Sequence, residues 1–162
     1  MQYFGHDRDE IIELIYRAAV DGSLWHDILE RLRAMTGAVG AMIISSRNGT
    51  VDWICTPEIK TVMEAYAGDG WDRFNIRIRR AASMENASFL TDLDVVVPAE
   101  IKEHPFYTRF LHRIGMGWAL GTIVRLPVDG LMIFHLERTY SDGQFLPEHH
   151  KFMDSLRAHL IQ

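Results

Sequence analysis

The sequence predicts an α+β fold in which helices cover both faces of a central antiparallel sheet of about five strands. Two hairpin signals support this prediction, because Asn48-Gly49 and Asp129-Gly130 each stand between two apolar, β-prone runs. Helical patterns precede, separate and follow these hairpins, without the regular strand–helix alternation of a parallel sheet. The 162 residues are expected to form a single domain, which is long enough to bury a core without disulfides.

The first half of the chain predicts two helices, a hairpin and a third helix. Apolar residues recur at helical spacing over residues 7–20 and 23–35, and Gly37 marks the end of the second helix. Residues 39–46 and 51–55 suit the two strands of a hairpin. Pro57 fits the first turn of a helix over residues 57–67.

The pattern then loosens, and the second half predicts a short edge strand, further helices and a second hairpin. The edge strand covers residues 89–91, and helices are expected over residues 98–104, 105–114 and 147–161. This order of elements is typical of an α/β/α sandwich of PAS- or GAF-like sensor type.

The second hairpin, residues 115–140, is expected to lie centrally in the sheet because both of its faces are largely apolar. A two-residue turn would place Ala119 and Gly121 on one face with Phe134, and His135 on the other. Small side chains on a sheet face leave space that another element or a ligand must fill.

Composition and charge exclude several classes of protein. The formal charge of −5 argues against direct DNA binding, and the small basic cluster of Arg73, Arg77, Arg79 and Arg80 is interpreted as a solvated helix or loop edge. No apolar run is long enough to span a membrane, and the start lacks the pattern of a signal peptide. The single cysteine, Cys55, fits a cytoplasmic location.

The sequence carries no recognisable catalytic or metal-binding motif. The eight histidines are scattered without ligand spacing, so neither a metal nor a cofactor is expected. His135 is interpreted as a hydrogen-bonded core histidine. Because nucleophile and nucleotide-binding signatures are also missing, an enzyme is not predicted.

Aromatic residues gather in the middle of the chain and around the second hairpin, where they predict either a packed aromatic core or a ligand pocket. Asn75 and Asp92 can accept a hydrogen bond from the N–H or O–H of a buried ring, or can hold the polar end of a ligand. The candidate ligand-binding residues are Trp53, Tyr66, Trp71, Asn75, Phe89, Trp118 and Phe134.

Four segments together resemble the N-terminal sensor domain of LuxR-type transcriptional regulators. These segments are WHDILERLRAMTGAVGAMIISS, NIRIRRAASMENASFLTDLDVV, HPFYTRFLHRIGMGWALGTIVRLP and GLMIFHLERT, so the likeness covers nearly the whole chain. The resemblance implies an α/β/α sensor that controls a helix-turn-helix domain, which is expected to be absent from residues 1–162. Contact with DNA would then occur only through that missing domain.

In quorum-sensing members of this family, the resemblance implies that acyl-homoserine lactones bind between the sheet and one helical layer. A tryptophan, a tyrosine and an Asp-Pro pair hold the ligand in that group. Here Tyr66 and Trp71 stand in the comparable region, but Asn75-Ile76 replaces Asp-Pro. A different small apolar or amphipathic ligand is therefore as compatible with the chain as a lactone.

Two functional hypotheses follow from these observations. The first is a dimeric, cytoplasmic, small-molecule-sensing domain of a LuxR-type regulator. The second is a ligand-free interaction or dimerisation module, because Phe152, Leu156 and Leu160 form an apolar stripe on the last helix. Such a stripe more often covers its own domain than a partner.

Overall fold

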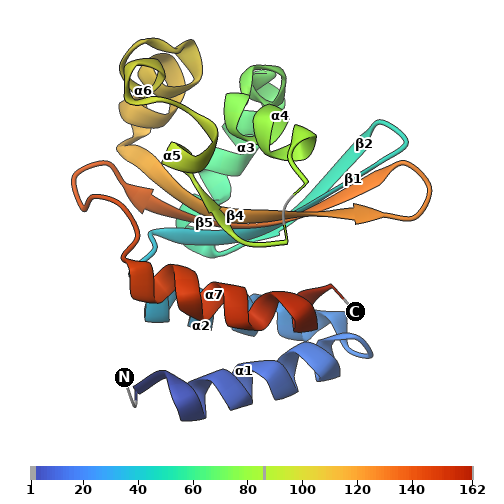
Figure 1. The fold of residues 1–162 in the computed structure, drawn as a ribbon. Coiled ribbons are helices and arrows are strands. Elements are labelled where there is room, and N and C mark those ends of the chain that lie inside the picture. The colour runs from blue at the N-terminus through green and yellow to red at the C-terminus, as the bar shows by residue number, and fades with distance from the viewer. Residues whose placement is uncertain (1–2, 86, 162) are drawn as a thin grey trace.

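The computed structural model, which describes residues 3–85 and 87–161, has a five-stranded antiparallel sheet between two layers of helices (Figure 1). The strand order is β2-β1-β5-β4-β3, so β5 is central. The predicted α+β sandwich is therefore confirmed. The strands are β1 (Gly40–Arg47), β2 (Thr50–Cys55), β3 (Leu90–Thr91), β4 (Met116–Leu126) and β5 (Gly130–Thr139).

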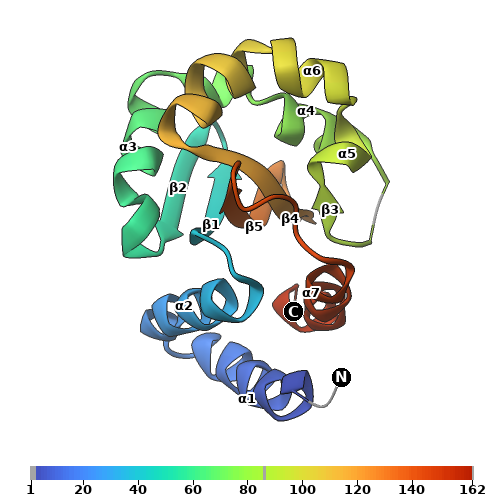
Figure 2. The same ribbon diagram turned by 90° about the vertical axis from the view of Figure 1, so that its left-hand side faces the viewer.

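One helical layer is built from the two ends of the chain. Its helices are α1 (Tyr3–Ala18), the short η1 (Gly22–Leu24), α2 (Trp25–Thr36) and α7 (Pro147–Leu160). Figure 2 shows α2 and α7 side by side beneath the sheet, with α1 below them. Phe152, Leu156 and Leu160 are buried in the core of this layer. The apolar stripe of the last helix therefore covers its own domain.

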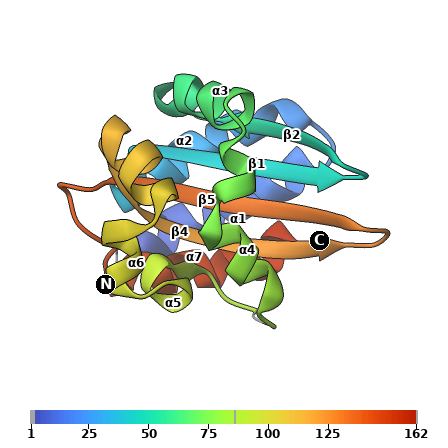
Figure 3. The ribbon, with the colours of Figure 1, turned by 90° about the horizontal axis from the view of Figure 1, so that it is seen from above.

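The other layer is formed by the middle of the chain. It contains η2 (Pro57–Ile59), α3 (Lys60–Gly68), η3 (Trp71–Phe74), α4 (Ile76–Ser83), α5 (Asp92–Val95), α6 (Pro98–Glu103), the π-helical turn η4 (Phe106–Leu111) and η5 (His112–Ile114). Figure 3 shows α4 lying across the middle of the sheet. None of the helices in the described part of the chain is both long and apolar enough to cross a membrane.

Helix α4 forms where the sequence pattern loosens and predicts no element. Asn75 begins the helix, and its side-chain oxygen accepts a hydrogen bond from the backbone N–H of Ile78 at 3.2 Å. Ile76 and Arg77 face the interior. Because an arginine takes part of the buried face, the apolar periodicity that would identify this helix is missing.

The register of the β4–β5 hairpin corrects the predicted faces. Leu126 pairs with Gly130, so the loop contains three residues rather than the two of the predicted turn. Moving a register by one residue transfers every side chain of a strand to the opposite face. Gly121 pairs with His135 and Thr122 pairs with Phe134, so the expectation that Phe134 shares a face with Ala119 and Gly121 is wrong.

Candidate functional site

Two small cavities lie side by side between the sheet and the helical layer formed by the middle of the chain, which is called the α3–η4 layer below. Cavity A lies over β4 and β5 beside β3, and its apolar lining includes Leu90, Val95 and Ile123. Cavity B lies nearer α3 and η4. Its lining includes Met63, Tyr66, Phe106 and Phe110. Each cavity has a volume of about 40 Å³, enough for a few water molecules.

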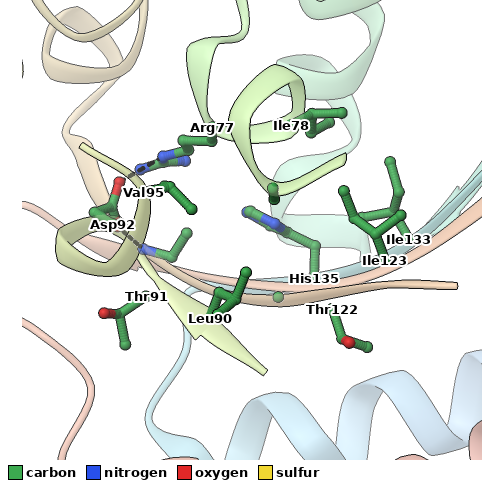
Figure 4. Close-up of a pocket in the computed structure, with 13 residues that line it drawn as sticks. Arg77, Ile78, Leu90, Thr91, Asp92, Val95, Thr122, Ile123, Ile133 and His135 are labelled. Carbon is green, nitrogen blue, oxygen red and sulfur yellow. Dashed lines mark hydrogen bonds and ion pairs between the residues drawn. The ribbon is translucent and has the colours of Figure 1, made fainter. Parts of the chain in front are cut away.

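A partition of three side chains separates the cavities. Arg77, Ile78 and His135 line both of them. Figure 4 shows His135 rising from the sheet toward the helix that carries Arg77 and Ile78. Gly121, opposite His135, makes this possible, since a Cβ there would come 3.0 Å from Nδ1 of the ring. The space expected above the small residues is thus partly filled by an imidazole.

The polar part of the partition is a buried ionic network centred on Arg77, which is only 6% exposed. Its Nε donates to Asp92 Oδ1 at 2.6 Å, and its two terminal nitrogens donate to the Glu137 carboxylate at 3.0–3.1 Å. Tyr107 donates its hydroxyl to Asp92 Oδ1 at 2.6 Å, and Nε2 of His135 lies 2.7 Å from Glu137 Oε2. The network links α4, α5, η4 and β5.

Burial and charge both affect the groups in this network. Burial alone would lower the pKa of the Arg77 guanidinium, but Asp92 and Glu137 outweigh it and raise that pKa above its ordinary value. Burial also raises the pKa of the Tyr107 phenol. Arg77 is therefore charged and Tyr107 protonated near neutral pH. The hydrogen-bonded core histidine predicted at position 135 is confirmed.

A second hydrogen-bonded pair faces cavity B. The side-chain nitrogen of Asn75 donates to the Tyr66 hydroxyl at 3.1 Å, while its oxygen caps α4. Burial raises the pKa of the Tyr66 phenol, and the bond from Asn75 partly opposes that rise. Both residues line the cavity. The side-chain oxygen of Asn75 already accepts the hydrogen bond from the backbone N–H of Ile78.

The structure divides the seven candidate ligand-binding residues into three groups. Tyr66 and Asn75 line cavity B. Trp53, Trp71 and Trp118 pack against the core of the same layer. Trp71 stacks on Phe110, which lines cavity B, with ring centroids 5.2 Å apart. Trp118 stacks instead on Tyr140 and donates to its carbonyl oxygen at 3.2 Å.

The remaining two candidates, Phe89 and Phe134, lie on the opposite side of the sheet. Both belong to the core shared with α1, α2 and α7, where Trp25 packs against Phe134. Phe134 lies there because of the hairpin register described above. Phe89 is fully buried just before β3, with its backbone N–H bonded to Asp154 of α7 at 2.6 Å.

Sequence reasoning missed most of the ionic network. Arg77 is buried, so its interpretation as part of a solvated basic edge is wrong. One signal was present in the sequence. His135 and Glu137 fall on the same side of a strand whose neighbours are apolar, and charged side chains on such a face require buried partners. No pattern links them to Arg77, because the partner lies 60 residues away.

A serine, a histidine and an aspartate meet between β3 and α7 without forming a catalytic relay. Nε2 of His150 lies 3.3 Å from Ser88 Oγ and 3.4 Å from Asp154 Oδ2, so one nitrogen faces both groups. A relay requires the two ring nitrogens to face different partners. The same histidine contacts the Phe89 carbonyl at 2.6 Å, which makes the cluster a link between elements. The described residues contain no grouping of three potential metal ligands.

Solved structures share this architecture. The chain is similar to CepR2 from Burkholderia cenocepacia, an N-acylhomoserine lactone dependent LuxR family transcription factor, with a TM-score of 0.70 and 12% identity over 96% of this chain and 92% of that one. It is also similar to the VqsR LBD domain from Pseudomonas aeruginosa, with a TM-score of 0.71 and 13% identity over 97% and 93% of the two chains. No protein-family model and no curated protein matches the chain. The fold is therefore that of ligand-binding domains of LuxR-type regulators.

Proposed function

We propose that this domain senses a small molecule as the regulatory part of a LuxR-type transcriptional regulator. The observation that carries the proposal is the pair of cavities on the α3–η4 side of the sheet, divided by Arg77, Ile78 and His135. Of these three side chains only Ile78 lies outside the ionic network, so we expect any joining of the cavities to begin with its movement. A joined cavity lined by apolar and aromatic residues with a few polar groups has the composition of a small-molecule site.

In keeping with the resemblance to LuxR-type sensors, we further propose that a separate domain binds DNA, that the protein is cytoplasmic and that it forms a homodimer. The proposal assigns no enzymatic activity and no cofactor. The ligand-free interaction module loses its main support, because the apolar stripe on α7 is buried within this domain.

Thermal unfolding in the presence of compounds tests the proposal. The chain is mixed with N-acylhomoserine lactones and with a panel of charged and uncharged short-chain amphiphiles. A compound at about 100 times its Kd stabilises the native state by about 2.7 kcal/mol, which raises Tm by several degrees. At least one compound is expected to do so.

The Ile78→Trp variant locates the effect, because a larger side chain there occupies both cavities. It is expected to abolish the ligand-induced rise in Tm. The same substitution at the exposed Ile114, which lines neither cavity, is the matched control and should preserve the rise. No rise with any compound, or an equal rise in Ile78→Trp, would contradict the proposal.

A further inference from the structure

The guanidinium of Arg77 has more donors than the protein uses. An arginine carries five N–H groups in a planar fork. Nε–H is directed to Asp92 Oδ1, and the Glu137 carboxylate takes bonds from both terminal nitrogens. The two hydrogens on one terminal nitrogen diverge, so only one of each pair can point at that carboxylate. Two N–H groups remain, and no acceptor for them is found among the described residues.

These two N–H groups belong to a side chain that is 6% exposed and lines both cavities. A buried charged donor without an acceptor is costly, because it has lost water and gained nothing in return. Whatever occupies the joined cavity is therefore the available acceptor. A ligand oxygen placed there would complete the hydrogen bonding of Arg77.

Every carboxylate oxygen of the network already accepts at least one hydrogen bond. Asp92 Oδ1 accepts from Arg77 and Tyr107, and Asp92 Oδ2 accepts from the backbone N–H of Ala119 at 2.6 Å. Glu137 accepts from Arg77 and from His135. One guanidinium stands against two carboxylates, so the cluster carries a net negative charge when His135 is neutral. An anionic ligand would add a second uncompensated charge in a buried place.

His135 offers the complementary group. Its Nε2 faces the Glu137 carboxylate, which only accepts, so the ring hydrogen is assigned to Nε2. Nδ1 of the neutral ring is then an acceptor. It lies above Gly121, whose missing side chain leaves that nitrogen open to cavity A. No described residue donates to it.

We infer that the joined cavity selects an uncharged, amphipathic ligand whose carbonyl oxygen accepts from Arg77 and whose N–H or O–H donates to Nδ1 of His135. The inference rests on the proposed function and specifies its ligand class. A primary or secondary amide and a hydroxyketone have this pairing of groups. A carboxylate is disfavoured by the net charge, and an ammonium ion carries no acceptor, so it would leave the two remaining N–H groups of Arg77 unpaired.

Four probes with the same six-carbon chain test the inference: hexanamide, 2-hexanone, hexanoate and hexylammonium. Binding is measured by ¹H–¹⁵N NMR titration of the whole chain and of the Ile78→Ala variant, which widens the partition without removing a polar group. Hexanamide is expected to bind most tightly and 2-hexanone next. The two charged probes should bind at least about tenfold more weakly than hexanamide.

The resonances of the terminal N–H groups of Arg77 and the carbonyl stretch of bound ¹³C-labelled 2-hexanone report the contact itself. Both should shift on binding, the stretch to lower wavenumber. Equal binding of charged and uncharged probes, or an unshifted carbonyl stretch, would overturn the ligand class and leave the sensing function intact. Failure of all four probes to bind Ile78→Ala would instead count against the cavity and thus against both proposals.

Discussion

At the scale of single residues, Arg77 links the α3–η4 layer to the sheet. It holds Asp92 at the start of α5 and Glu137 on β5, and its guanidinium lies 5.2 Å from the centroid of the Tyr107 ring. A buried ionic group of this kind contributes little net stability compared with an apolar replacement of all partners. Loss of one partner is different, because it leaves the others charged and unpaired.

Arg77→Met is therefore expected to lower the free energy of unfolding by roughly 3–5 kcal/mol, since Asp92 and Glu137 would remain buried without their counter-ion. Urea denaturation measures the change. Arg79→Met, on the exposed side of the same helix, is the control and should stay within about 0.5 kcal/mol of the wild type. A loss below about 1 kcal/mol in Arg77→Met would show that the network is not coupled as described.

At the scale of elements, α4 is a short helix that covers both cavities and is held at each end. Asn75 caps its start. Near its other end, Arg80 forms an ion pair with Glu100 of α6 and donates to the Val95 carbonyl at 3.1 Å. The hydrogen bond from Arg80 and the backbone bond from Val97 lower the pKa of Glu100 to about 2, so this pair persists in mild acid.

Asn75→Ala removes both the cap and the bond to Tyr66. We expect a loss of about 1 kcal/mol in the free energy of unfolding, the usual value of an N-cap. In this variant the backbone amides of α4 should also exchange with solvent faster than those of α7. Asn75→Ser keeps a capping oxygen and should lose less than half as much; equal losses in the two variants would argue against a capping role.

The hairpin loop carries a second element-scale prediction. Val128 has φ of 65° although it is β-branched, and its side chain is 81% exposed. Val128→Asn is expected to raise the free energy of unfolding by about 1 kcal/mol, because asparagine tolerates the left-handed region and no packing is lost. The same substitution at the exposed Val20 should change little. An unchanged or lower stability in Val128→Asn would rule out strain in this loop.

At the scale of the whole molecule, the sequence predicted the sandwich because its signals are local. The turn at Asn48-Gly49, the stop at Gly37 and the two hairpins depend on neighbouring residues, and the structure confirms them. The candidate site depends on contacts between distant segments. The loop between β4 and β5 is one residue longer than predicted, which reverses the face of β5 relative to that of β4. The network of Arg77 joins residues up to 60 positions apart. Local patterns carry no information about such pairs.

Acid conditions should destabilise the whole domain through the buried His149 and the half-buried His112. Burial lowers the pKa of His112 and that of His149 from the ordinary 6.5. The unfolded chain then binds more protons, so stability is full above about pH 6.5 and falls as the pH drops below that value. Urea midpoints at pH 7.5 and 5.5 measure the difference. His112→Phe should reduce it, and His26→Phe, at an exposed position, should not; an unchanged difference in His112→Phe would contradict this account.

The most direct test of the sensing proposal is a methyl NMR titration that locates the ligand. Isoleucine methyl groups are labelled, and the compound that raises Tm most is added. The account predicts shifts at Ile44 and Ile78 around cavity B and at Ile133 in cavity A, with Ile11 and Ile28 unaffected on the far side of the sheet. Shifts confined to Ile11 and Ile28, or no shifts at all, would contradict it.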